Sequence, residues 1–85
     1  MMTYDEANFA LIEARIARAE HLPRLAAADE AARAAADADG VVPEPVRAAQ
    51  REAWAEYHRL DARVRDLARL RGLRLWEMRQ GAAGR

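Results

Sequence analysis

The side chains that could do chemistry in this chain are few, and their spacing fits no familiar catalytic or metal-binding pattern. The sequence has no cysteine, serine or lysine, and Thr3 carries the only hydroxyl group outside the two tyrosines. Most of the nucleophiles used in covalent catalysis are therefore missing. We expect a non-enzymatic protein with no catalytic residue.

A metal site would have to use His21 and His58, which are the only histidines. Folding could bring them within about a helical turn of each other, with Glu20 or Glu56 supplying a carboxylate. A protein-bound metal needs three or four ligands in a defined geometry, and neither E-x-x-H nor H-x-x-x-H spacing occurs. The better interpretation is two surface histidines, with no metal and no cofactor.

The charges balance, because 14 arginines stand against 14 acidic residues. Seven arginines lie between residues 59 and 79, but at about 100° per residue they spread around a helix axis rather than forming one phosphate-binding face. No signal peptide and no apolar run long enough to cross a membrane is visible. We expect a cytoplasmic protein that binds no nucleic acid, membrane or small molecule, from a GC-rich genome that favours arginine and alanine.

The first helix is predicted from Tyr4 to about Asp37. Thr3 and Glu6 have the spacing of a capping box. An apolar stripe at 3–4 spacing is expected along this helix, and it changes face near Pro23. Its first part consists of Phe9, Ile12, Ile16 and Ala19, and its second part, on a rotated face, consists of Leu22, Leu25, Ala28, Ala32 and Ala36. Pro23 removes one backbone hydrogen bond, so we expect a kink there, with a short break as the alternative.

The second helix is predicted from Pro45 to about Arg71. Gly40 suits the end of the first helix, and Pro45 suits the first turn of the next. Two interleaved seams give the coiled-coil spacing: Val46, Ala53, Leu60, Leu67, and Gln50, Tyr57, Val64, Arg71. Gly72 is expected to end this helix. Favourable i,i+4 ion pairs are predicted at Glu20–Arg24, Asp29–Arg33 and Asp61–Arg65.

The short connector predicts one all-α domain over residues 1–80, an antiparallel helical hairpin followed by a disordered tail over 81–85. Folding about Val41 and Val42 sets Ile16 opposite Leu67, Ala19 opposite Val64, and Ala26 opposite Tyr57. A two-helix layer leaves apolar surface uncovered, so we expect assembly into a helical bundle. A homodimer comes first, and docking onto a larger protein is the alternative.

These features favour a small interaction protein, which is an adaptor, a small subunit or an inhibitor. Large apolar side chains that a thin core cannot fully cover are the candidate partner contacts. They are Trp54, Tyr57, Leu73, Trp76 and Met78.

Two resemblances supply alternatives. Tyr57 and Asp61 match the Y-x-x-x-D pattern of the small helical-hairpin substrates of type VII secretion, which the chain resembles in size. Those proteins carry W-x-G at the turn, where this chain has Asp39-Gly40-Val41. The chain also resembles small helical chorismate mutases, which bind a dianion without a nucleophile. That resemblance implies an arginine-based enzyme using Arg15 and Arg33, although the lysine of that family is absent.

Overall fold

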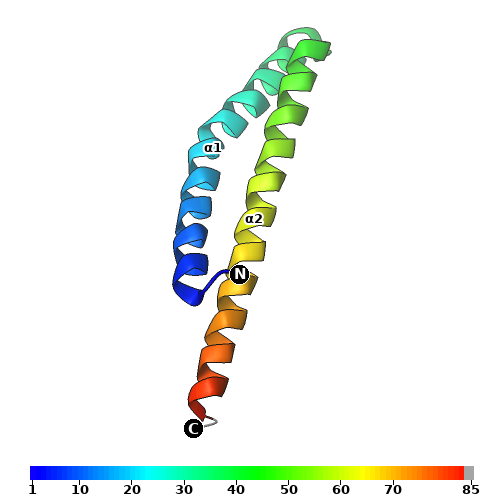
Figure 1. Cartoon of the computed structure of the whole chain (residues 1–85). Helices are drawn as coiled ribbons and strands as arrows, with labels where there is room; N and C mark the ends of the chain where they lie inside the picture. The colour runs from blue at the N-terminus through cyan, green and yellow to red at the C-terminus, as the bar shows by residue number, and fades with distance from the viewer. Residues whose placement is uncertain (84–85) are drawn as a thin grey trace.

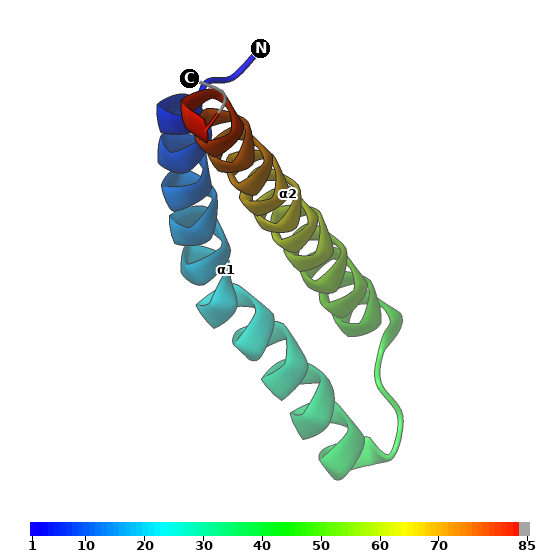
Figure 2. The ribbon, with the colours of Figure 1, turned by 90° about the horizontal axis from the view of Figure 1, so that it is seen from below.

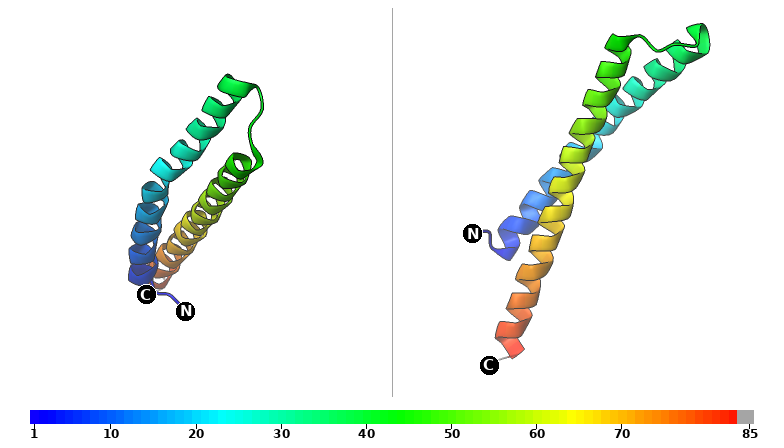
Figure 3. Two further views of the ribbon diagram at one scale, coloured as in Figure 1. Left: turned by 90° about the horizontal axis from the view of Figure 1, so that it is seen from above. Right: turned by 90° about the vertical axis from the view of Figure 1, so that its right-hand side faces the viewer.

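The computed structural model describes residues 1–83, which form two long helices joined by a short connector (Figure 1). Helix α1 spans Tyr4–Asp39 and helix α2 spans Glu44–Ala83. They run antiparallel, with the connector at one end and the start of α1 and the end of α2 towards the other (Figure 2). The rod measures 69 × 18 × 15 Å, and in side view α2 extends beyond the start of α1 (Figure 3). The predicted all-α hairpin is confirmed.

Local sequence signals account for where α1 begins and ends. The Thr3 hydroxyl accepts a hydrogen bond from the backbone N–H of Glu6 (3.2 Å), and the Glu6 carboxylate accepts one from the backbone N–H of Thr3 (3.0 Å). Gly40 has the left-handed conformation (φ 71°) that ends helices, and its N–H donates to the Ala36 carbonyl (2.8 Å). The predicted capping box and glycine cap are both confirmed.

Helix α1 continues through Pro23, so the alternative of a break followed by a new helix is wrong. Proline removes a single hydrogen bond from the ladder, and the alanines that follow it have the highest helix propensity of any residue. The kink at Pro23 stays a prediction.

Helix α2 also continues through Gly72 as far as Ala83, which corrects both the end expected near Gly72 and a tail beginning at residue 81. Residues 84–85 of the predicted tail lie outside the described residues. A helical glycine costs only about 1 kcal/mol relative to alanine, and polar contacts hold this stretch against α1. Arg71 donates to the Asn8 side-chain oxygen (3.0 Å), and Arg74 donates to the Met2 carbonyl (2.7 Å).

The two helices meet along one narrow apolar face each. Leu11 is the only large side chain that is fully buried among the described residues, and it packs with Ala14, Val64 and Leu67. On α2 the predicted seams are confirmed, since every member is buried or half-buried. On α1 the buried positions recur at heptad spacing: Ala7, Leu11, Ala14, His21, Leu25 and Ala32.

Before Pro23, the face of α1 predicted to contact α2 is the wrong one, whereas Leu25 and Ala32 of the rotated stripe beyond it are buried. Phe9, Ile12 and Ile16 are 63%, 47% and 53% exposed. At 100° per residue they lie about half a turn away from the buried positions. The predicted partners of Ile16, Ala19 and Ala26 are wrong for the same reason, because all three residues are exposed.

The register between the helices also differs from the prediction. Arg18 pairs with Asp61, four positions before the predicted partner at residue 65. Arg71 contacts Asn8, again four positions before the predicted partner at residue 75. The helices are therefore displaced by about one helical turn.

The burial pattern makes a stability prediction for two leucines on α2. Leu67→Ala removes buried methyl groups and should lower the free energy of unfolding by about 2–5 kcal/mol. Leu73→Ala should change it by less than about 0.5 kcal/mol, because Leu73 is 48% exposed. Chemical denaturation followed by circular dichroism measures both, and equal losses would contradict the described core.

Candidate functional site

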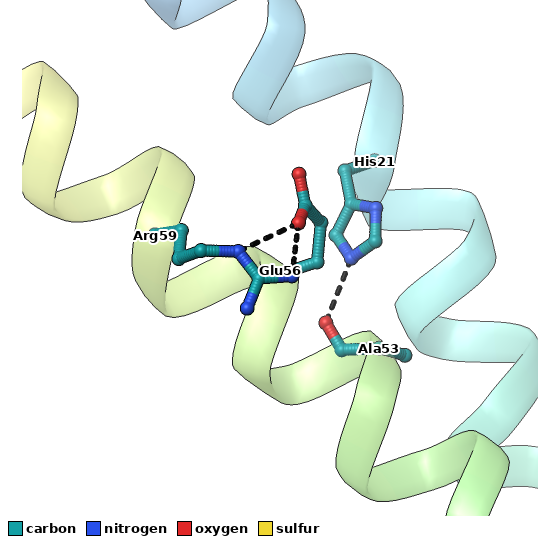
Figure 4. Close-up of polar contacts among 4 residues, drawn as sticks. All are labelled: His21, Ala53, Glu56 and Arg59. Carbon is teal, nitrogen blue, oxygen red and sulfur yellow. Dashed lines mark hydrogen bonds and ion pairs between the residues drawn. The ribbon is translucent and has the colours of Figure 1, made fainter.

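A polar groove lies between the helices at the middle of the rod, and His21 is its most buried ionisable side chain. The His21 ring nitrogen Nε2 lies 2.8 Å from the Ala53 carbonyl oxygen, to which it donates across the helix pair (Figure 4). Only 8% of His21 is exposed. The prediction of two surface histidines is therefore wrong for His21, and it holds for His58, which is exposed and stacks near Trp54.

The groove encloses about 420 Å³, and its walls carry charges of both signs. Arg59 Nε donates to the Glu56 carboxylate (2.9 Å), so these two side chains pair along α2 (Figure 4). Glu20 and Glu52 also line the groove. Nowhere in residues 1–83 do three or more metal-ligating side chains come together. The groove can hydrogen-bond small polar molecules or water, and its one buried polar side chain is already used to join the helices.

Two of the five predicted contact residues take part in the hairpin itself. Trp54 donates its indole N–H to the Asp29 carboxylate (2.8 Å) on the facing helix, and Gln50 donates to the same oxygen (2.8 Å). Tyr57 is half-buried on the seam and meets Trp54 edge-on, with ring centroids 5.9 Å apart. Trp54 is 38% exposed, so part of its surface remains open.

The other three predicted contact residues project from the C-terminal part of α2. Trp76 and Met78 are each 58% exposed, and Leu73 is 48% exposed. Leu73 and Trp76 lie three residues apart and share a face, whereas Met78 lies about 140° from Leu73 around the helix. The structure therefore places the five residues in separate places rather than in one patch.

A further run of exposed apolar side chains lies on α1, outside the five predicted contact residues. We call Phe9, Ile12, Ile16, Ala19, Pro23 and Ala26 the outer stripe. All six are exposed, and they follow 3–4–3–4–3 spacing on the side of α1 that faces away from α2. The sequence shows the spacing of Phe9, Ile12, Ile16 and Ala19, but it does not show that these side chains face away from α2.

The residues behind the first resemblance have roles inside the hairpin, whereas those behind the second lie far apart. Asp61 accepts from Arg18 (2.8 Å) across the helix pair and lies 3.3 Å from Arg65 on its own helix. Tyr57 and Asp61 both lie within α2. Arg15 and Arg33 are separated by 18 residues along α1, which is about 27 Å, too far to hold one small dianion together within a chain.

Neither described helix is long and apolar enough to cross a membrane. Comparison of the chain with protein-family models, curated proteins and solved structures finds no match.

The Asp29 contacts predict a pH-dependent change in Trp54. The hydrogen bond from Gln50, followed by the one from Trp54, lowers the pKa of Asp29 below its ordinary value. Because the folded pKa lies below the unfolded pKa, these contacts stabilise the hairpin above the unfolded pKa. That stabilisation is lost as the pH falls through the folded pKa.

In a Trp76→Phe background, Trp54 fluorescence should change with a midpoint below the ordinary pKa of an aspartate. Asp29→Asn should abolish the change. A transition that persists unchanged in Asp29→Asn would show that Trp54 reports on another group.

Proposed function

We propose that this chain is a non-enzymatic interaction protein whose main contact surface is the outer stripe of α1. The observation that carries the proposal is the direction of Phe9, Ile12 and Ile16, which are about half exposed on the side away from α2. Soluble proteins seldom expose clustered large apolar side chains unless the surface contacts something. Covering the exposed half of these three side chains would contribute roughly 2–5 kcal/mol.

The overall shape supports the same proposal. The chain exposes 6213 Å², whereas a compact monomer of its mass, 9.5 kDa, exposes about 5,000 Å². Its radius of gyration is 19.3 Å, against about 12 Å for a globule of this length. The difference in area, about 1,200 Å², exceeds the roughly 800 Å² that each partner contributes to a standard protein interface.

Leu73 and Trp76 provide a second and smaller candidate surface. They lie on the side of α2 opposite its seam positions, so they point away from α1. Half-exposed tryptophans are common anchors of protein interfaces. Adaptors and small subunits often contact two partners, and two apolar faces on opposite sides of a rod suit that role.

Site-specific photocrosslinking in the native host tests the proposal. A photoreactive phenylalanine analogue at Ile12 should give a protein adduct, because the side chain would lie inside a contact. The same analogue at Arg63, which is exposed on α2, is the matched control and should give little adduct.

The mass of the adduct identifies the type of partner. Twice the chain mass indicates a second copy of this chain, and a different mass indicates another protein. Absence of an adduct at Ile12, or equal yields at both positions, would contradict the proposal.

A further inference from the structure

We infer that the outer stripe is covered by a second copy of this chain, with the two α1 helices lying parallel. This inference rests on the proposed function and names the occupant of its surface. The arrangement places an α1–α1 pair at the centre, with one α2 on each outer side.

The outer stripe has the spacing of a two-stranded coiled coil. Phe9, Ile16 and Pro23 are seven residues apart and occupy the first apolar position of the heptad. The second apolar position, three residues later, holds Ile12, Ala19 and Ala26. The stripe spans residues 9–26, which is about 27 Å of helix. Asp5 and Glu30 occupy the next seam positions and bound the stripe at its two ends.

The amount of exposed surface suits a second copy. Each chain exposes about 1,200 Å² more surface than a compact monomer of its mass, spread along the rod. This excess is larger than the roughly 800 Å² that each partner contributes to a standard interface. The chain also has no net charge, so two copies meet without overall repulsion.

The charges beside the stripe select the parallel orientation. Arg15 lies directly before Ile16, and Glu20 lies directly after Ala19, five residues after Arg15. In a parallel coiled coil, residues at these two positions lie side by side on opposite helices. Arg15 of each copy would therefore face Glu20 of the other, giving two equivalent ion pairs. Both side chains are exposed, and within residues 1–83 neither forms an ion pair.

The other flanking positions agree with this choice. In the parallel pair, Asn8 faces Glu13 and Leu22 faces Ala27, so no like charges meet beside the stripe. An antiparallel pair in the longest overlapping register would set Glu13 against Glu20 on both sides. Shifting it by one heptad would set Glu13 against Glu13 and Arg15 against Arg15. Either register places like charges together, which destabilises a coiled coil.

Charge reversal on the full-length chain tests the orientation. Sedimentation equilibrium over a dilution series should show a monomer–dimer equilibrium. Glu20→Arg would place Arg15 against an arginine and should weaken the dimer about tenfold. Arg15→Glu should weaken it similarly. The double variant Arg15→Glu/Glu20→Arg restores opposite charges and should return the dissociation constant to within about threefold of the original.

Glu52→Arg is the control, because Glu52 is an exposed glutamate on α2, outside the stripe. It should leave the dissociation constant unchanged. Circular dichroism of each variant checks that the helices remain formed. Neither Arg15 nor Glu20 makes an ion pair or side-chain hydrogen bond among the described residues, so their reversal should not unfold the hairpin.

Three results would overturn the inference. Tighter association of Glu20→Arg would indicate an antiparallel pair, because that change removes the contact between Glu13 and Glu20. Growth beyond a dimer would indicate head-to-tail contacts through Leu73 and Trp76. A monomer at every concentration would exclude self-association, while a crosslinked adduct of a different mass at Ile12 would still support the proposed contact surface.

Discussion

A two-helix hairpin can bury only one face of each helix, and this limit governs the whole molecule. Helix α1 carries apolar residues on two opposite faces, so one of them must remain open. The buried positions of α1 are mainly alanines, with Leu11, His21 and Leu25, so this face is narrow and its side chains are mostly small. The bulkier side chains, Phe9, Ile12 and Ile16, are left on the outside. An elongated rod with a narrow core and an apolar outer face is the result.

Polar contacts fix the register that this narrow core leaves weakly defined. Arg18–Asp61 and Arg71–Asn8 cross between the helices, and His21 donates to the Ala53 carbonyl near the middle. Asp29 gathers hydrogen bonds from Gln50 and Trp54 closer to the connector. Each of these contacts joins α1 to α2 and needs a particular offset between the two helices. They define the register of the two helices more sharply than alanine packing can, because a small side chain makes few van der Waals contacts.

Much of the fold could be predicted from the sequence, because it depends on local signals. The capping box at Thr3 and Glu6, the left-handed glycine at Gly40 and the seam positions of α2 all follow from residue type and spacing. Beyond Pro23 the rotated apolar stripe also follows the inner face of α1, since Leu25 and Ala32 are buried. The inner face before Pro23 could not be predicted in the same way. Two stripes share that helix, and hydrophobicity favours Phe9, Ile12 and Ile16. Close packing instead selects Ala7, Leu11 and Ala14, which are all buried.

The exposure of the outer stripe could not be predicted for the same reason. Trp54 and Tyr57 are large and aromatic, which suggests an interface. Within the hairpin, however, Trp54 donates to the Asp29 carboxylate on the facing helix, and Tyr57 is half-buried on the α2 seam beside Trp54. The end of α2 could not be predicted because glycine usually favours the end of a helix. Here Arg71 and Arg74, on either side of Gly72, donate to Asn8 and to the Met2 carbonyl across the hairpin. Contacts of this kind depend on register, which a single sequence does not specify.

The most direct measurement compares thiol labelling at two adjacent positions of α1. The chain contains no cysteine, so Leu11→Cys and Ile12→Cys each introduce a single thiol. In dilute solution, Ile12→Cys should react quickly with a maleimide and Leu11→Cys should be protected, because only Leu11 faces α2. Protection of Ile12→Cys together with fast labelling of Leu11→Cys would mean that the outer stripe is the hairpin core. That result would contradict the burial of Leu11 and the exposure of Ile12 described above.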